Sequence, residues 1–228
     1  MEYGLINRKN QKSVALKAVD ISGDLAGNAL WVRIQQHYHN DSGENAEFIY
    51  TFPMPEDAAI CDFTATIGEN VITTEIKERE QAFAAYDEAI RQGDSAFLLE
   101  SMRANVFQIS LGQIDAGEEV KIDINYFQEI KTGDAQMRIT IPTLVGPRYI
   151  PGNVAGEKIG PGEAHPTDQV PDADFITPPI GDTDYRASLK MNIKTLSPFI
   201  SIESVSHRIQ VEQSDPTTAS VFLTEGTT

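Results

Sequence analysis

Apolar and polar residues alternate along most of this chain. In residues 30–39, the even positions share one face of an extended strand and the odd positions, which include two histidines, share the other. The same period of two recurs in residues 107–111, 119–126 and 137–141. Half-buried strands of this kind are typical of antiparallel sheets with one face on a core and one in water. Because turn-forming residues separate them, the pattern predicts an all-β fold, an antiparallel β-sandwich.

One segment breaks this alternation. Residues 75–92 contain strong helix formers and no glycine or proline, and a glycine follows them. Phe83, Tyr86 and Ile90 recur at helical spacing, so one stripe of the helix can be buried while the rest stays in water. We therefore expect one α-helix, over about residues 77–92, docked on the sheet.

The character of the sequence changes again after the last of these strands. Residues 142–184 are rich in proline and glycine and contain no periodic stretch, which predicts a long loop or linker. Strand-like alternation resumes in residues 187–193, 200–202 and 221–223. The expected organisation is a β-sandwich domain at 1–152, a Pro/Gly-rich loop or linker at 153–184, and additional β-strands at 185–228.

Composition narrows the function classes. The 228 residues include 18 Lys and Arg against 34 Asp and Glu, a formal net charge of −16. This balance excludes a general affinity for nucleic acid or anionic membrane, because both need clustered positive charge. No apolar run approaches the ~18–20 residues that cross a bilayer, and the first residues are too polar for a secretory signal. The single cysteine, Cys61, forbids an internal disulfide, and we expect it to be a small buried side chain.

A series of short motifs carries more specific information. The motifs are YTFPMPEDAA (50–59), EIKEREQA (75–82), AYDEA (85–89), LLE (98–100), RANVF (103–107), GQI (112–114), GEEV (117–120), PT (142–143) and PRYIPG (147–152). No single motif is specific. In this order and spacing, over about residues 4–152, they resemble the vault protein inter-alpha-trypsin (VIT) domain family.

The resemblance implies an antiparallel β-sandwich with one helix, and a non-enzymatic role. Domains of this family usually precede a von Willebrand factor A (VWA) domain, which typically carries the adhesion motif Asp-x-Ser-x-Ser that binds a metal ion. This chain lacks that motif, so metal-dependent adhesion is not carried over to any residue. The resemblance also implies that residues 185–224 join toward a downstream domain, and that the chain is the N-terminal part of a longer protein.

Two histidines are candidate metal ligands. His37 and His39 are two positions apart, so an extended strand directs both imidazoles to the same side. Such a pair can share a transition metal, but a third ligand would have to come from a neighbouring strand. Outward-facing polar positions on a solvated sheet explain the pair equally well.

Four acidic residues in the proline-rich tract are candidates for calcium binding. Asp172, Asp174, Asp182 and Asp184 can offer oxygen ligands on irregular backbone. They lack the glycine and the terminal glutamate of an EF-hand, so solvated loop acids are the favoured interpretation. We expect no resident cofactor and no firm metal site.

Two further features concern the surface. Arg148 and Tyr149 lie between two prolines, and both are residue types enriched at interface hot spots. The simpler interpretation is that Tyr149 packs on the sandwich and Arg148 meets a local carboxylate. Residues 40–42, Asn-Asp-Ser, match an N-glycosylation sequon, a three-residue match that is common by chance.

These observations favour a non-enzymatic interaction module that positions a downstream VWA-type adhesion domain in a surface or secreted protein. The expected partner is that domain of the same protein, with extracellular protein or matrix ligands as further partners. A stand-alone calcium- or carbohydrate-binding β-sandwich is the alternative. A hydrolase is motivated only by surplus carboxylates, and no serine-plus-acid spacing near a histidine supports one. We therefore assign no catalytic residue.

Overall fold

The described part of the chain is built from β-strands. The structure, a computed structural model, describes residues 4–10, 14–55, 57–73, 99–103, 106–133, 136–142, 153–159, 165–171, 173 and 185–224. Its strands are β1 (Gly4–Asn7), β2 (Leu16–Ala26), β3 (Ala29–His39), β4 (Ala46–Pro53), β5 (Ala58–Ile67), β6 (Asn70–Thr73), β7 (Leu99–Arg103), β8 (Val106–Ile114), β9 (Glu119–Glu129), β10 (Thr132–Gly133), β11 (Gln136–Met137), β12 (Arg186–Lys194), β13 (Ile209–Asp215) and β14 (Thr218–Leu223).

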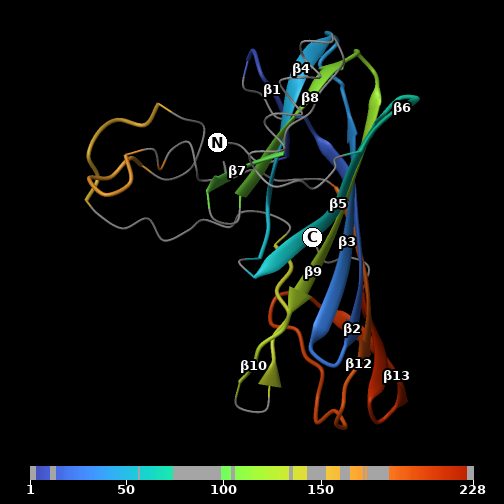
Figure 1. The fold of residues 1–228 in the computed structure, drawn as a ribbon. Coiled ribbons are helices and arrows are strands. Elements are labelled where there is room, and N and C mark those ends of the chain that lie inside the picture. Colours follow the sequence, from blue (N-terminus) through green and yellow to red (C-terminus); the bar gives the residue numbers. More distant parts are fainter. Residues whose placement is uncertain are drawn as a thin grey trace.

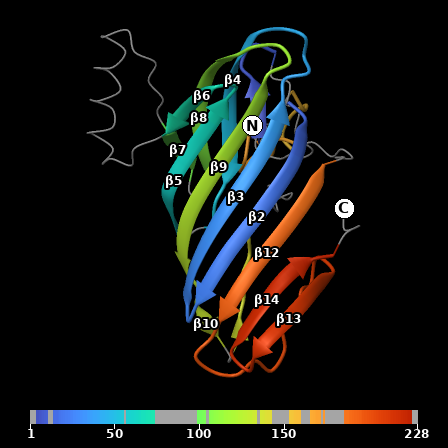
Figure 2. The ribbon, with the colours of Figure 1, turned by 90° about the vertical axis from the view of Figure 1, so that its right-hand side faces the viewer.

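Eight strands form a large sheet in the order β13-β14-β12-β2-β3-β9-β5-β6 (Figure 2). The strands that follow the proline-rich tract belong to this sheet, because β12 pairs along its whole length with β2. That pair is parallel, whereas β12 and β14 are antiparallel. The expectation of a wholly antiparallel fold is therefore wrong at this one pair: the large sheet is mixed. A parallel neighbour is sterically possible here because a long crossover, not a tight turn, connects the two strands.

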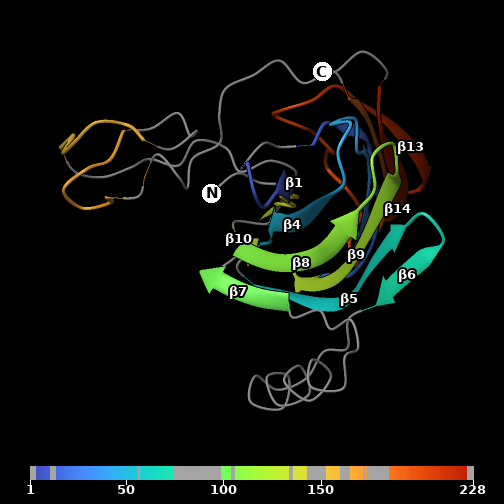
Figure 3. The same cartoon turned by 90° about the horizontal axis from the view of Figure 1, so that it is seen from above.

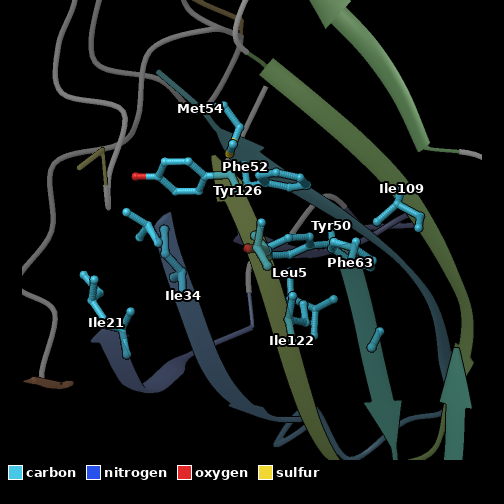
Figure 4. Close-up of a cluster of buried hydrophobic side chains, with 14 of the residues drawn as sticks. Leu5, Ile21, Ile34, Tyr50, Phe52, Met54, Phe63, Ile109, Ile122 and Tyr126 are labelled. Carbon is cyan, nitrogen blue, oxygen red and sulfur yellow. The ribbon is translucent and has the colours of Figure 1, made fainter. Parts of the chain in front are cut away.

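A second sheet of four strands, in the order β1-β4-β8-β7, packs against the large one (Figures 1 and 3). Aromatic side chains meet between the two sheets: the ring centroids of Tyr50 and Phe52 in β4 each lie 5.9 Å from that of Phe63 in β5 (Figure 4). Phe63 and Tyr50 are completely buried. The two layers, with the core between them, match the predicted sandwich architecture.

Gln36 is a polar side chain that lies between the two sheets, among apolar residues. Gln36 of β3 accepts hydrogen bonds at Oε1 from the hydroxyls of Tyr38 and Tyr50, at 2.8 and 2.6 Å. Both tyrosines are fully buried, and burial raises the pKa of each hydroxyl above its usual value. The carbonyl oxygen of Gln36 thereby satisfies one hydroxyl from each of the two sheets, which ties β3 to β4.

The predicted alternation is confirmed in the long strands. In β3 and β9, the inward positions are buried and the outward positions are exposed or half-buried. It fails in two shorter stretches. Of the expected 137–141 strand only Met137 pairs with a partner, Thr132, and Ile200 of the expected 200–202 strand is almost completely exposed. Alternation alone does not make a strand, because a strand also needs a neighbour for its backbone hydrogen bonds.

Cys61 is exposed, so the expectation of a buried cysteine is wrong. The pairing of β5 with β9 shifts register between Ile60 and Asp62, which leaves Cys61 as the extra residue of a β-bulge. Beyond the bulge Phe63 and its alternate neighbours are buried, whereas before it Ile60 faces inward. A bulge reverses the inside–outside phase of a strand by one residue, and Cys61 is the residue at which the phase changes.

The helix expected over about residues 77–92 lies outside the described residues, as does the domain boundary expected at residue 152. Within the parts of the chain that the structure describes, no helix is long and apolar enough to cross a bilayer.

Candidate binding surface

The large sheet has a broad outer face that no described strand covers (Figure 2). The odd-numbered residues of β3 lie on it, as the alternation predicted. Neighbouring strands place their own outward residues in register beside them, so each row across the sheet is a line of side chains that belong to distant parts of the sequence. This outer face is the candidate surface described below.

The middle of the outer face is a polar cluster around Asp123 of β9. Arg33 donates to both carboxylate oxygens, from Nε at 2.5 Å and from Nη2 at 3.0 Å, and Gln35 Nε2 donates at 2.7 Å. Partial burial alone would raise the pKa of Asp123, but the hydrogen bonds from Arg33 and Gln35 outweigh it and hold the pKa below its usual value. Asp123 therefore stays ionised, with both carboxylate oxygens bound by neighbouring side chains.

The two candidate metal ligands lie on the same face but each meets a different carboxylate. His37 Nε2 is 3.9 Å from Asp20 Oδ2, and His39 Nδ1 is 3.0 Å from Glu119 Oε1. Over the described residues, no group of three or more His, Cys, Asp or Glu side chains gathers in a way that could hold a metal ion. The structure thus confirms the shared face and does not bring a third ligand to the pair.

The other predicted site residues cannot be placed. Asp172, Asp174, Asp182 and Asp184 lie outside the described residues, and so do Arg148 and Tyr149. Calcium binding by the acidic residues and interface contacts by the Arg-Tyr pair stay predictions.

An aromatic pair interrupts the polar outer face. Trp31 of β3 and Phe127 of β9 are directly opposite each other in the antiparallel register, and 45% of Trp31 and 39% of Phe127 is exposed. On the far side of Phe127 the register places Ala59, whose methyl group is too small to cover the ring. The alternation in the sequence predicts that Trp31 lies on the same outward face as His37 and His39. It does not predict that Phe127 lies beside it, because that depends on the register of β3 with β9.

The Asn-Asp-Ser sequon has a structural role. Asn40 is fully buried, and its Nδ2 donates to the backbone carbonyls of Glu44, Ile114 and Asp115 at 3.0–3.3 Å. Its Oδ1 accepts from the Ser42 hydroxyl at 2.6 Å. Nδ2 is the atom that a glycan would occupy, so glycosylation of Asn40 is incompatible with this packing.

The loop between β12 and β13, residues 195–208, carries three large apolar side chains in water. Leu196, Ile200 and Val205 are 92%, 99% and 93% exposed. Ile202 of the same loop is half-buried and packs on the core, which fixes the middle of the loop to the sandwich. We refer to residues 195–208 as the apolar loop.

Comparison with known protein families identifies the domain to which the central strands belong. The family model described as vault protein inter-alpha-trypsin domain matches residues 16–126, from β2 into β9. This chain contains a VIT domain. The resemblance inferred from the motif series is thereby confirmed, and β12–β14 lie beyond the matched residues although they complete the same sheet.

The curated relatives that this chain matches are much longer proteins. Von Willebrand factor A domain-containing protein 5A of Rattus norvegicus is 31% identical over 150 residues, which are 64% of this chain and 18% of that protein. Protein mono-ADP-ribosyltransferase PARP4 of Mus musculus is 35% identical over 142 residues, 62% of this chain and 7% of that protein. A third relative, von Willebrand factor A domain-containing protein DDB_G0292016 of Dictyostelium discoideum, is 29% identical over 151 residues, 64% of this chain and 16% of that protein. The chain thus spans less than a fifth of the length of these relatives.

Solved structures add no functional information. A putative nutrient binding protein from Legionella pneumophila aligns with a TM-score of 0.43 at 7% identity, over 96% of this chain and 66% of that chain. An M1 zinc metallopeptidase from Deinococcus radiodurans aligns with a TM-score of 0.40 at 9% identity, over 96% of this chain and 40% of that chain. Similarity at this level carries no argument about activity.

Proposed function

We propose that this chain is a non-enzymatic interaction module that positions a VWA domain of the same polypeptide. The observation that carries the proposal is the VIT domain at residues 16–126, together with relatives whose names record a VWA domain. The polar side chains of the outer face support a surface for recognition, because the carboxylate at its middle, Asp123, is already bound by Arg33 and Gln35. The proposal includes an extracellular or cell-surface location and no cofactor.

The apolar loop is the surface we assign to the contact with a neighbouring domain. Leu196, Ile200 and Val205 are three large apolar side chains of one loop that are almost completely exposed, and exposed apolar side chains that gather in one place mark interaction sites. The loop also ends beside the point where the chain leaves β14, because the Thr224 amide donates to the Arg208 carbonyl at 3.2 Å. The start of the loop lies at the other end of β14, because the Thr195 and Phe199 amides donate to the Thr217 and Pro216 carbonyls at 2.9 Å. Of the three exposed side chains, Val205 is therefore the nearest in sequence to the point where a following domain would begin.

The test begins with the native protein isolated from its source cells. We expect an intact mass well above the 25.1 kDa of this chain, with a VWA-type sequence after residue 224. A native mass of 25.1 kDa would contradict the positioning role.

A substitution then tests the contact itself. Val205→Asp should lower the melting temperature of the native protein but leave that of this chain alone unchanged, because the side chain is 93% exposed in the chain alone. Val71→Asp is the matched control, since Val71 in β6 is 64% exposed but lies away from the apolar loop along the sheet. Equal effects of the two substitutions on the native protein would contradict the assignment of the loop as the contact.

A further inference from the structure

The exposed aromatic pair on the outer face, Trp31 and Phe127, is a candidate binding site. Trp31 and Phe127 lie side by side on adjacent strands, and Ala59 leaves the outer side of the Phe127 ring open. Two aromatic rings exposed next to each other on a flat strand surface offer π faces on which a ligand with its own flat, weakly positive C–H face can stack.

A line of hydrogen-bonding groups leads to this pair within the same row of the sheet. Ser220 donates to Asn192 Oδ1 at 3.0 Å, and Asn192 Nδ2 donates to Asp24 Oδ1 at 2.9 Å. Asp24 is the direct neighbour of Trp31 on β2, and its second carboxylate oxygen has no hydrogen-bond partner among the described residues. The indole N–H of Trp31 likewise has none in the described part of the chain. An acceptor already oriented by Asn192 and a free donor thus lie next to the exposed ring.

On the other side of the aromatic pair the polar groups are already paired. Arg33, one outward position from Trp31, is bound to Asp123, and Asn125, one outward position from Phe127, donates to Asp62 Oδ2 at 3.3 Å. On this side of the aromatic pair, the positive charge of Arg33 is therefore already neutralised by Asp123.

This arrangement discriminates between ligand classes. Asp24 and Asp62, within a chain of net charge −16, oppose the phosphates of a nucleic acid even though bases also stack on aromatic rings. The fully buried core of a typical protein interface is more apolar than its rim and larger than this pair, which consists of two residues in an otherwise polar face. A neutral, hydroxyl-rich ring with one apolar face satisfies all three features: the rings, the free acceptor and the absence of a countercharge.

We propose that Trp31 and Phe127, with Asp24 beside them, form a stacking site for the hexopyranose rings of a neutral oligosaccharide. The rings hold the apolar face of the sugar, while Asp24 accepts a hydrogen bond from a hydroxyl and the Trp31 N–H donates one. The site is open and flat, so it fits a chain of sugars lying across the strands and not an enclosed monosaccharide. It does not depend on a VWA domain, and it can fail or hold independently of the function proposed above.

The chain supplies its own reporter, because Trp31 is its single tryptophan. The intact chain is titrated with cellohexaose, maltohexaose, mannohexaose and chitohexaose up to about 10 mM, with sorbitol as a polyol that has no ring face. At least one hexasaccharide should change Trp31 emission saturably and protect it from acrylamide quenching, and sorbitol should do neither. No saturable change with any of the four, or no protection from acrylamide, would overturn the proposal.

Three variants separate stacking from a general effect on the fold. Phe127→Ala keeps the reporter and should weaken binding by about tenfold or more, whereas Phe127→Tyr, which retains the ring, should bind like the unaltered chain. Val71→Ala removes an exposed apolar side chain elsewhere on the same face and should change nothing. Equal affinity of Phe127→Ala and the unaltered chain would overturn the assignment. Saturable quenching by a thymidine dodecanucleotide and by none of the sugars would also overturn it, in favour of nucleobase stacking.

Discussion

Individual polar side chains hold this sandwich in register at points that the apolar core cannot define. Gln36 is the clearest example, since its Oε1 receives two tyrosine hydroxyls that come from opposite sheets. A buried hydroxyl without an acceptor loses its hydrogen bond to water and gains nothing in return. The geometry between β3 and β4 is therefore fixed by a single carbonyl oxygen as well as by packing.

Replacement of Gln36 should thus be costly. Gln36→Leu leaves two buried hydroxyls without an acceptor, and we expect a loss of about 2–5 kcal/mol in the free energy of unfolding, measured by urea denaturation. Gln35→Leu is the control on the opposite face and should cost about 1 kcal/mol or less. Adding Tyr38→Phe and Tyr50→Phe to Gln36→Leu should recover part of the loss. Equal losses for Gln36→Leu and Gln35→Leu would contradict this role.

Asn40, which follows the end of β3, is a second buried polar side chain that satisfies hydrogen-bonding groups of other segments. Asn40→Ala removes the donor to three backbone carbonyls, and we expect a loss of about 2–4 kcal/mol in the free energy of unfolding. Asn28→Ala is a matched control, because exposed Asn28 makes one side-chain bond, to Glu129 at 2.9 Å; it should cost less than about 1 kcal/mol. If the two variants unfolded at the same urea concentration, the loop would not depend on Asn40.

At the scale of elements, the sequence predicts which face of a long strand is buried but not which strand lies next to it. The alternation in β3 and β9 is confirmed residue by residue, because burial of one face imposes a period of two. The neighbours Trp31 and Phe127 follow from a register between segments about ninety residues apart, and no local pattern specifies it. The sequence therefore predicts the outward face on which Trp31 lies, but not that Trp31 and Phe127 are neighbours on it.

Two of the local failures, at Cys61 and at Ile200, have related causes. Cys61 is exposed because one extra residue in β5 changes the phase of the strand, and a bulge leaves no mark on composition. Ile200 alternates with Ile202 as a strand would, yet no neighbour offers it a ladder and its side chain stays in water. Likewise the parallel pairing of β12 with β2 depends on the long connection between them, which the alternation of β12 does not reveal.

The pairing of β12 with β2 makes a prediction about cooperativity. Met191 of β12 is buried against β2, where Gly23 leaves room for its thioether, so Met191→Ala should lower the free energy of unfolding by about 2–4 kcal/mol. Leu196→Ala, at a position 92% exposed, should cost less than about 0.5 kcal/mol. Trp31 fluorescence and far-ultraviolet circular dichroism should report one coincident transition. A separate early transition seen only by circular dichroism would mean that β12–β14 unfold on their own.

At the scale of the whole molecule, the buried tyrosines set an upper limit to the pH range of stability. Burial raises the folded-state pKa of Tyr38, Tyr50 and Tyr126 above the usual 10.0. A raised folded pKa means that the folded state keeps its proton where the unfolded chain has lost it. This stability is complete below pH 10 and declines as the pH rises above it, by about 1.4 kcal/mol per pH unit for each tyrosine that stays protonated.

We therefore expect alkaline unfolding in which these tyrosines ionise only as the sandwich opens. Tyrosinate absorbance should rise in two stages, first from exposed tyrosines and then together with the loss of circular dichroism. In the Tyr38→Phe, Tyr50→Phe double variant the second stage should be smaller and stability should fall less steeply above pH 10. A single absorbance stage complete before unfolding begins would contradict the burial argument.

The parallel pairing of β12 with β2 also has a consequence for how the protein is made. Contacts such as that between Ser188 and Asp20 join residues 168 positions apart. On a ribosome that adds about 5–20 residues per second, β2 emerges roughly 8–35 s before the strand that covers its edge. During that interval the nascent sheet ends in an open strand, which is the kind of edge to which other extended chains attach. The nascent chain therefore needs protection at β2 until β12 has been translated, and a chaperone that binds extended segments would have its target there.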